Sequence, residues 1–166
     1  MVEDGDSITA SVTTNDTNFT VVSRTFTPTG GTGENLTVTK TDNSITADIT
    51  AGMRATGGEI SIVVACENDS TQTATITYTV AKVYTINLAD LSQDGDTVTG
   101  TVTTNNTSFS VVATSNGAEI DDSNITKTDN SVSVDVTGYT ANDVISITVI
   151  CDTDNTKSAT KTITLA

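Results

Sequence analysis

Apolar and polar residues alternate along short segments of the chain. In the C-terminal half, apolar residues alternate with Thr, Ser or Asp over five such segments. A period of two places the apolar side chains on one face of a β-strand. Clusters of Asp, Asn and Gly separate the segments, and only residues 51–57 could form a helical turn. The predicted strands cover residues 97–102, 109–113, 131–136, 144–151 and 159–165.

The chain is a tandem duplication. Residues 5–15, 19–22, 40–45 and 60–66 recur as residues 95–105, 109–112, 127–132 and 145–151, at offsets of 90, 90, 87 and 85. The first copy therefore carries about five extra residues, and residues 28–33 look like an enlarged loop. We predict two modules, residues 1–83 and residues 84–166.

The first module lacks the segment with which the second module begins. Residues 84–91 precede the turn at Gly95, and subtracting 90 places their counterpart before residue 1. Either this first strand is dispensable or cut off by a chain boundary, or a neighbouring chain supplies it and covers the sheet edge. No Gly, Ser or Pro spacer separates residues 71–83, the predicted last strand of the first module, from Tyr84. We therefore expect the modules to form a stiff rod.

Several runs shared by both copies resemble bacterial and phage immunoglobulin-like (Ig-like) modules. They are Lys-Thr-Asp-Asn-Ser at 40–44 and 127–131, Ile-Ser-Ile at 60–62 and 145–147, and an acidic turn before a Thr-rich last strand. The resemblance covers nearly the whole chain twice. It implies an all-β fold of two tandem Ig-like antiparallel β-sandwiches. The chain has no Trp and one Cys per module, so the resemblance does not extend to antibody-like recognition.

Composition narrows the function classes. The chain has 166 residues, 38 of them Thr, and a net charge of −14. Low hydrophobic content at high net charge is typical of disorder, but the β-branched residues favour folded strands. Only seven Lys and Arg face 21 Asp and Glu, so we expect no nucleic-acid partner. We also expect no membrane insertion, and without His there is no imidazole for catalysis or zinc binding.

Paired carboxylates are the candidate metal ligands. Asp94 and Asp96 flank Gly95, and Asp152 and Asp154 form a second acidic turn. Ca²⁺ takes six to eight oxygen ligands, of which such pairs supply some, but no EF-hand loop is present. These four residues are weak calcium candidates, and solvated turn residues are the favoured interpretation. We predict no catalytic residue and no cofactor.

Two repeated residue types have a structural and a chemical interpretation. Cys66 and Cys151 occupy the same repeat position, and one Cys per module cannot form an intradomain disulfide. We interpret both as small buried hydrophobic residues, with a redox or crosslinking role as the alternative. Lys40 and Lys127 lie in equivalent predicted tight turns, with a Lys–Asn isopeptide crosslink as the alternative.

These features predict a non-enzymatic structural or display module of a tailed-phage virion. It would be a capsid decoration protein, head fibre or tail accessory. Its expected partners are a capsid or other virion protein or neighbouring copies, with surface glycans as a further candidate. Residues 1–5 contain no signal-peptide pattern, which suits this virion-surface location. The alternatives are an Ig-like pair from a bacterial cell-surface adhesin or stalk, and a carbohydrate-binding module, although the six aromatic residues are scattered.

Overall fold

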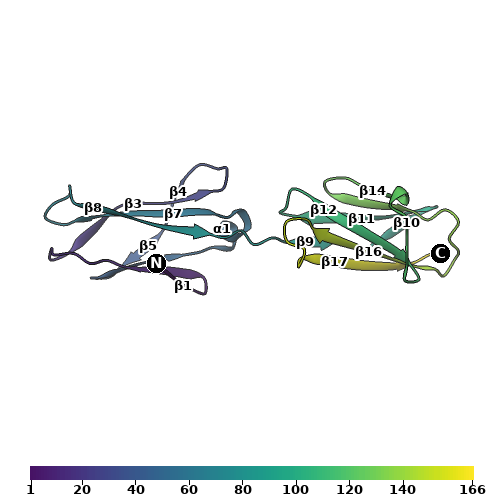
Figure 1. The fold of residues 1–166 in the computed structure, drawn as a ribbon, viewed down its shortest axis with the longest axis horizontal. Helices are drawn as coiled ribbons and strands as arrows, with labels where there is room; N and C mark the ends of the chain where they lie inside the picture. Colours follow the sequence, from purple (N-terminus) through teal and green to yellow (C-terminus); the bar gives the residue numbers. More distant parts are fainter. The chain divides into compact units, whose positions relative to one another are not determined.

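The computed structural model describes residues 1–166, which form two compact units (Figure 1). Unit 1 is Met1–Val83 and unit 2 is Tyr84–Ala166. Both are all-β, and each contains two antiparallel sheets. The helical segments are short: α1 (Ala51–Thr56) in unit 1 and the 3₁₀ helix η1 (Asp122–Asn124) in unit 2. Neither of them has the length and apolarity that crossing a bilayer requires.

Unit 1 consists of two four-stranded sheets. Given in the order of hydrogen-bonded neighbours, the first sheet is β1 (Val2–Asp4), β2 (Ser7–Ser11), β6 (Ser44–Asp48) and β5 (Val38–Lys40). The second is β4 (Glu34–Asn35), β3 (Phe19–Pro28), β7 (Gly58–Cys66) and β8 (Thr73–Val80). The pairing of β3 with β7 contains a bulge between Val21 and Ser23, at the exposed Val22.

Unit 2 repeats these sheets and adds one strand. Its first sheet is β10 (Ser92–Asp94), β11 (Thr97–Thr104), β15 (Ser131–Asp135) and β14 (Ile125–Lys127), with β9 (Ile86–Leu88) also paired to β11. Its second sheet is β13 (Ala118–Glu119), β12 (Phe109–Ser115), β16 (Val144–Cys151) and β17 (Ser158–Thr164). The extra strand is β9, because the repeat offset of 90 makes β10 the counterpart of β1.

Each unit has one hydrophobic core to which both of its sheets contribute, as in a β-sandwich. In unit 1, Ile8 and Ile45 of the first sheet and Phe19 and Ile62 of the second belong to the same buried cluster. The alternating sequence produces this directly. Along β16 every second side chain is fully buried, and polar or half-buried residues lie between them. The alternation-based prediction of an all-β, sandwich-type fold is therefore confirmed.

Local details differ from the prediction at two places. Residues 51–57, expected to hold at most one helical turn, form α1, whose N-cap Thr50 accepts a hydrogen bond from the Met53 amide at 3.2 Å. Residues 84–91, expected to form one leading strand, contain only the short strand β9, and β10 follows separately. Both strands pair with β11, but with different halves of it.

Candidate functional site

The two units differ most where β9 covers unit 2. β9 pairs antiparallel with the second half of β11, with Leu88 opposite Val102 and Ile86 opposite Thr104. It also contacts β16 and β17 of the other sheet, beside which it is drawn in Figure 1. Leu88 is fully buried in the unit 2 core, and Ile86 packs against that core. β9 therefore closes one edge of the sandwich.

Polar contacts fix the start of this covering segment. The Thr85 amide donates to Oδ1 of Asn105 at 2.8 Å. The Thr85 carbonyl oxygen accepts from the Thr104 hydroxyl at 2.7 Å and from the Asn105 amide at 3.3 Å. Thr104 and Asn105 thus hold both backbone groups of Thr85.

In unit 1 the corresponding edge is open. The counterparts of Val102 to Thr104 are residues 12–14, and β1 pairs only with Ser7 to Thr9. On its other side, the Val12 amide donates to the Asn43 carbonyl oxygen at 2.8 Å, as the Val102 amide does to Asn130. A groove of about 370 Å³ runs along the uncovered side, lined by residues 12–15, Phe19, residues 64–66 and residues 72–74.

Three residues of unit 1 are more exposed than their repeat counterparts in unit 2. Val12 is half-buried whereas Val102 is buried, and Ala74 is exposed whereas Ala159 is half-buried. Cys66 is half-buried, whereas Cys151 has an exposed fraction of 0%. All three unit 1 residues line the groove. Their extra exposure follows from the absence of a strand in the place that β9 takes in unit 2.

Unit 1 keeps the polar residues that fix the covering segment in unit 2. Thr14 and Asn15 are identical to their counterparts Thr104 and Asn105. Both hydroxyls accept a hydrogen bond at 3.0 Å from the amide two residues later, so the local turn is the same. The Thr14 hydroxyl lies 3.4 Å from Cys66 Sγ, whereas that of Thr104 donates to Thr85.

The strand beneath the covering segment differs between the units at one position, Gly100 in β11 and Ala10 in β2. A Cβ on Gly100 would lie 2.8 Å from Leu88 Cδ1 and 2.8 Å from Leu91 Cδ2, so the covering segment requires a glycine there. Its counterpart in unit 1 is the buried Ala10. The open groove therefore has less room at the end that corresponds to Leu88.

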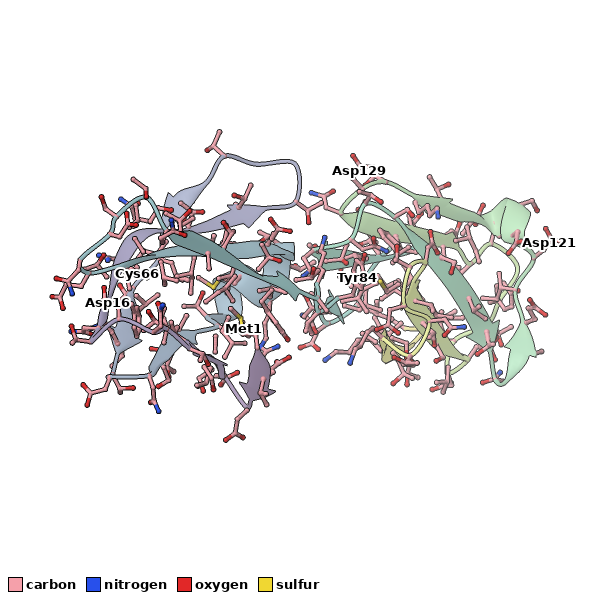
Figure 2. The ribbon with its side chains drawn as sticks, turned by 60° about the vertical axis from the view of Figure 1, so that its left-hand side comes forward. Met1, Asp16, Cys66, Tyr84, Asp121 and Asp129 are labelled. Carbon is pink, nitrogen blue, oxygen red and sulfur yellow. The ribbon has the colours of Figure 1, made fainter.

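Acidic residues surround the other end of the groove. Asp16 follows the groove residue Asn15, and Glu67 and Asp69 lie in the loop between Cys66 and Gln72. Figure 2 shows Asp16 and Cys66 close together. Backbone and side-chain hydrogen bonds from Asn68 lower the pKa of Asp16. The Thr71 hydroxyl and amide lower the pKa of Asp69. Both carboxylates therefore stay charged to a lower pH than an unperturbed aspartate does.

No protein-family model matches the chain. A search of curated proteins also returns no match.

The calcium candidates do not come together in unit 2. Asp94 and Asp96 flank the turn that precedes β11, whereas Asp152 lies beside Ser108, which follows the end of that strand. Ser108 lowers the pKa of Asp152, and the Thr156 hydroxyl lowers that of Asp154. No group of three or more His, Cys, Asp or Glu side chains is placed to hold a metal ion. The two acidic pairs occupy turns at opposite ends of β11.

The repeated lysines have a role that the sequence did not show. Lys40 Nζ lies 4.6 Å from the ring centre of Phe19, and Lys127 Nζ lies 5.4 Å from that of Phe109. Each ammonium therefore makes a cation–π contact with the repeat-equivalent phenylalanine. Lys40 Nζ also donates to Asn18 Oδ1 at 2.8 Å on the exposed surface. The counterpart of Asn18 is Ser108, so a lysine–asparagine pair occurs here in unit 1 only.

Proposed function

We propose that the chain is a non-enzymatic structural and display module made of two tandem Ig-like sandwiches, carried on the surface of a tailed-phage virion. In that role it acts as a capsid decoration protein, head fibre or tail accessory. Its partner is a capsid or other virion protein, or neighbouring copies of itself. The observation that carries this proposal is the nature of the surface, on which polar groups are engaged with each other rather than gathered into a reactive site.

Hydroxyl and carboxylate groups show this engagement throughout both units. Hydroxyls pair across neighbouring strands, as between Thr9 and Thr46 at 3.0 Å and between Thr148 and Thr160 at 2.8 Å. Carboxylates bind the threonine two residues later, as Asp135 binds the Thr137 hydroxyl at 2.6 Å. Ser115 is the one buried polar residue. Such a surface favours solubility and stability over chemistry.

Charge and connection support display in many copies. The net charge is −6 in unit 1 (10 acidic and four basic residues) and −8 in unit 2 (11 and three). Like charges on neighbouring copies repel and keep a crowded surface soluble. Residues 81–85 alone connect β8 to β9, and they contain no Gly, Ser or Pro. This short connection supports a rod-like tandem arrangement.

Mass spectrometry of purified virions from the virus that encodes the sequence tests the proposal. We expect the chain at a fixed stoichiometry to the major capsid protein, retained after high-salt washing. The competing function is an Ig-like pair of a bacterial surface adhesin or stalk. Absence from virions, together with a cellular reading frame that continues into further repeats, would establish that alternative.

A further inference from the structure

We propose that the open groove of unit 1 binds, in trans, an extended strand of a partner polypeptide that takes the place β9 has in unit 2. The partner strand runs antiparallel to residues 12–14, with apolar side chains at alternate positions and basic residues just before its N-terminal end. This inference rests on the geometry and charge of the groove, and it does not depend on the proposed virion role.

Backbone geometry sets the register of the partner strand. In unit 2 the Ala89 amide donates to the Thr101 carbonyl oxygen at 2.9 Å, and the Asn105 amide donates to that of Thr85 at 3.3 Å. Antiparallel hydrogen-bonded pairs alternate along a ladder, so Asn87 opposite Thr103 is the pair between them. In unit 1 the amide and carbonyl groups of Thr13, the counterpart of Thr103, therefore face the groove. They can form a hydrogen-bonded pair with one residue of the partner strand.

The retained side chains would hold the partner strand at its N-terminal end. Thr14 and Asn15 repeat the pair that binds the backbone of Thr85 in unit 2. On entry of a strand, the Thr14 hydroxyl would turn from Cys66 Sγ to the carbonyl oxygen of the residue that corresponds to Thr85. The partner would cover Val12, Cys66 and Ala74, whose counterparts are less exposed in unit 2.

Size and charge distinguish the partner strand from β9 itself. Ala10 stands where Gly100 makes room for Leu88, so the partner has a smaller apolar side chain at that position. In unit 2, Asp90 pairs with Lys161 at 2.6 Å, whereas the counterpart of Lys161 is Ile76. An acidic residue at the Asp90 position would therefore lose its partner in unit 1.

Two observations favour a partner polypeptide over a second copy of this chain. All strands of residues 1–166 are paired within their own unit, so a second copy could donate a strand only by opening its own sheet. The strand enters beside Asp16, Glu67 and Asp69, and a second copy of net charge −14 would be repelled there. A segment with lysine or arginine before its apolar positions fits this end.

Peptide binding to the full chain tests the proposal. The probe is a fluorescent peptide, Lys-Lys-Thr-Ile-Asn-Val-Ala-Ser, whose last six positions repeat residues 85–90 with valine for Leu88 and serine for Asp90. Anisotropy should show saturable binding that weakens with added salt. The peptide should slow thiol labelling of Cys66 at least about tenfold, because it covers the groove wall, and leave Cys151 unchanged. A probe with proline in place of asparagine should bind at least about tenfold more weakly, because it lacks the central ladder N–H.

A matched pair of variants locates the binding. Ala74→Glu places a carboxylate in the groove, whereas Thr75→Glu makes the same charge change at an exposed position on the opposite face of β8. Ala74→Glu should weaken binding at least about tenfold, and Thr75→Glu should leave it nearly unchanged. Equal thermal midpoints would show that both variants fold.

Several results would overturn the proposal. They are no protection of Cys66 by the peptide, equal binding of the proline probe, or equal binding by both variants. Concentration-dependent dimers of the free chain that Ala74→Glu abolishes would also overturn it, because a second copy would then occupy the groove.

Discussion

Units 1 and 2 share their sheets and most of their core, yet only unit 2 has its edge covered. In unit 2 the segment before β10 inserts Leu88 into the core. Unit 1 has no such segment among residues 1–83, and its side chains compensate in part. Ala10 replaces Gly100, and Tyr78 replaces Ile163 and binds the carboxylate of Glu3, which also pairs with Arg54 at 2.9 Å. The comparison shows that a sandwich built from residues 1–83 can lack this covering strand when nearby side chains cover most of the exposed core.

The largest expected difference between the units is in thiol reactivity. Cys66 lines the groove, whereas Cys151 is fully buried and reacts only when unit 2 opens. An opening free energy of about 5 kcal/mol slows labelling roughly a thousandfold or more. Timed labelling with a chromogenic disulfide reagent, followed by peptide mass spectrometry, should show Cys66 modified first. Similar rates would mean that unit 1 is as closed as unit 2.

Removing the core contact of β9 should bring unit 2 closer to unit 1. Leu88→Ala deletes a fully buried side chain and should lower the free energy of unfolding of unit 2 by about 3 kcal/mol. Urea titrations monitored by labelling of Cys151 report on unit 2, and hydrogen exchange of unit 1 peptides, read by mass spectrometry, serves as the control for unit 1. A loss below about 1 kcal/mol would show that β9 contributes little to stability.

Exchanging the residue under the covering segment should have a smaller effect. Gly100→Ala forces Leu88 and Leu91 to move, and should destabilise unit 2 by about 1–2 kcal/mol. The reciprocal Ala10→Gly should cost unit 1 about 1 kcal/mol, through the lost methyl group and the freer backbone. Labelling of Cys151 in urea measures the first change, and hydrogen exchange of unit 1 peptides in urea measures the second. If Gly100→Ala were neutral, the contrast in groove size between the units would be wrong.

The smallest expected difference is in acid sensitivity. Hydrogen bonds lower the pKa of Glu3, Asp16 and Asp69 in unit 1. In unit 2 they lower the pKa of six aspartates: Asp90, Asp121, Asp135, Asp143, Asp152 and Asp154.

A lowered folded-state pKa stabilises the fold above the unfolded value of about 4, and this stabilisation is lost as the pH falls through the folded value. Between about pH 4 and pH 2, unit 2 should therefore lose more stability than unit 1. Hydrogen exchange of peptides from each unit, read by mass spectrometry in urea at several pH values, measures the difference. Asp143→Asn should reduce the loss in unit 2, since Asp143 accepts hydrogen bonds from Asn116 and Thr140. Parallel curves for the two units would contradict this prediction.

The positions of the long strands along the chain could be predicted because apolar residues alternate and the sequence is repeated. Alternation identified the long strands, such as β16, and the offsets of 90 and 85 aligned the two units residue by residue. That alignment also showed which segment the first copy lacks. The short strands β4, β5 and β13 were not predicted, because two or three residues carry no measurable period.

Side-chain contacts between distant residues were beyond the sequence. The stacking of Lys40 on Phe19 joins positions on two different sheets, and only the folded register brings them together. The half-exposed state of Cys66 was also missed, because Cys66 and Cys151 occupy the same repeat position and both were interpreted as buried. Repeated sequence predicts repeated structure only where the neighbouring segments are repeated as well.

The short link between β9 and β10 means that one peptide-bond cleavage would separate the covering strand from the rest of its sandwich. Residues 89–91 alone connect the covering strand to the rest of its sandwich, and Ala89 and Asp90 are exposed. A single peptide-bond cleavage there would leave β10 to β17 as one continuous chain with the same strand set as unit 1. β9 would then be held only by non-covalent contacts and free to exchange with a competing strand. One hydrolysed bond would thus convert a closed domain into an acceptor of the kind that unit 1 already resembles.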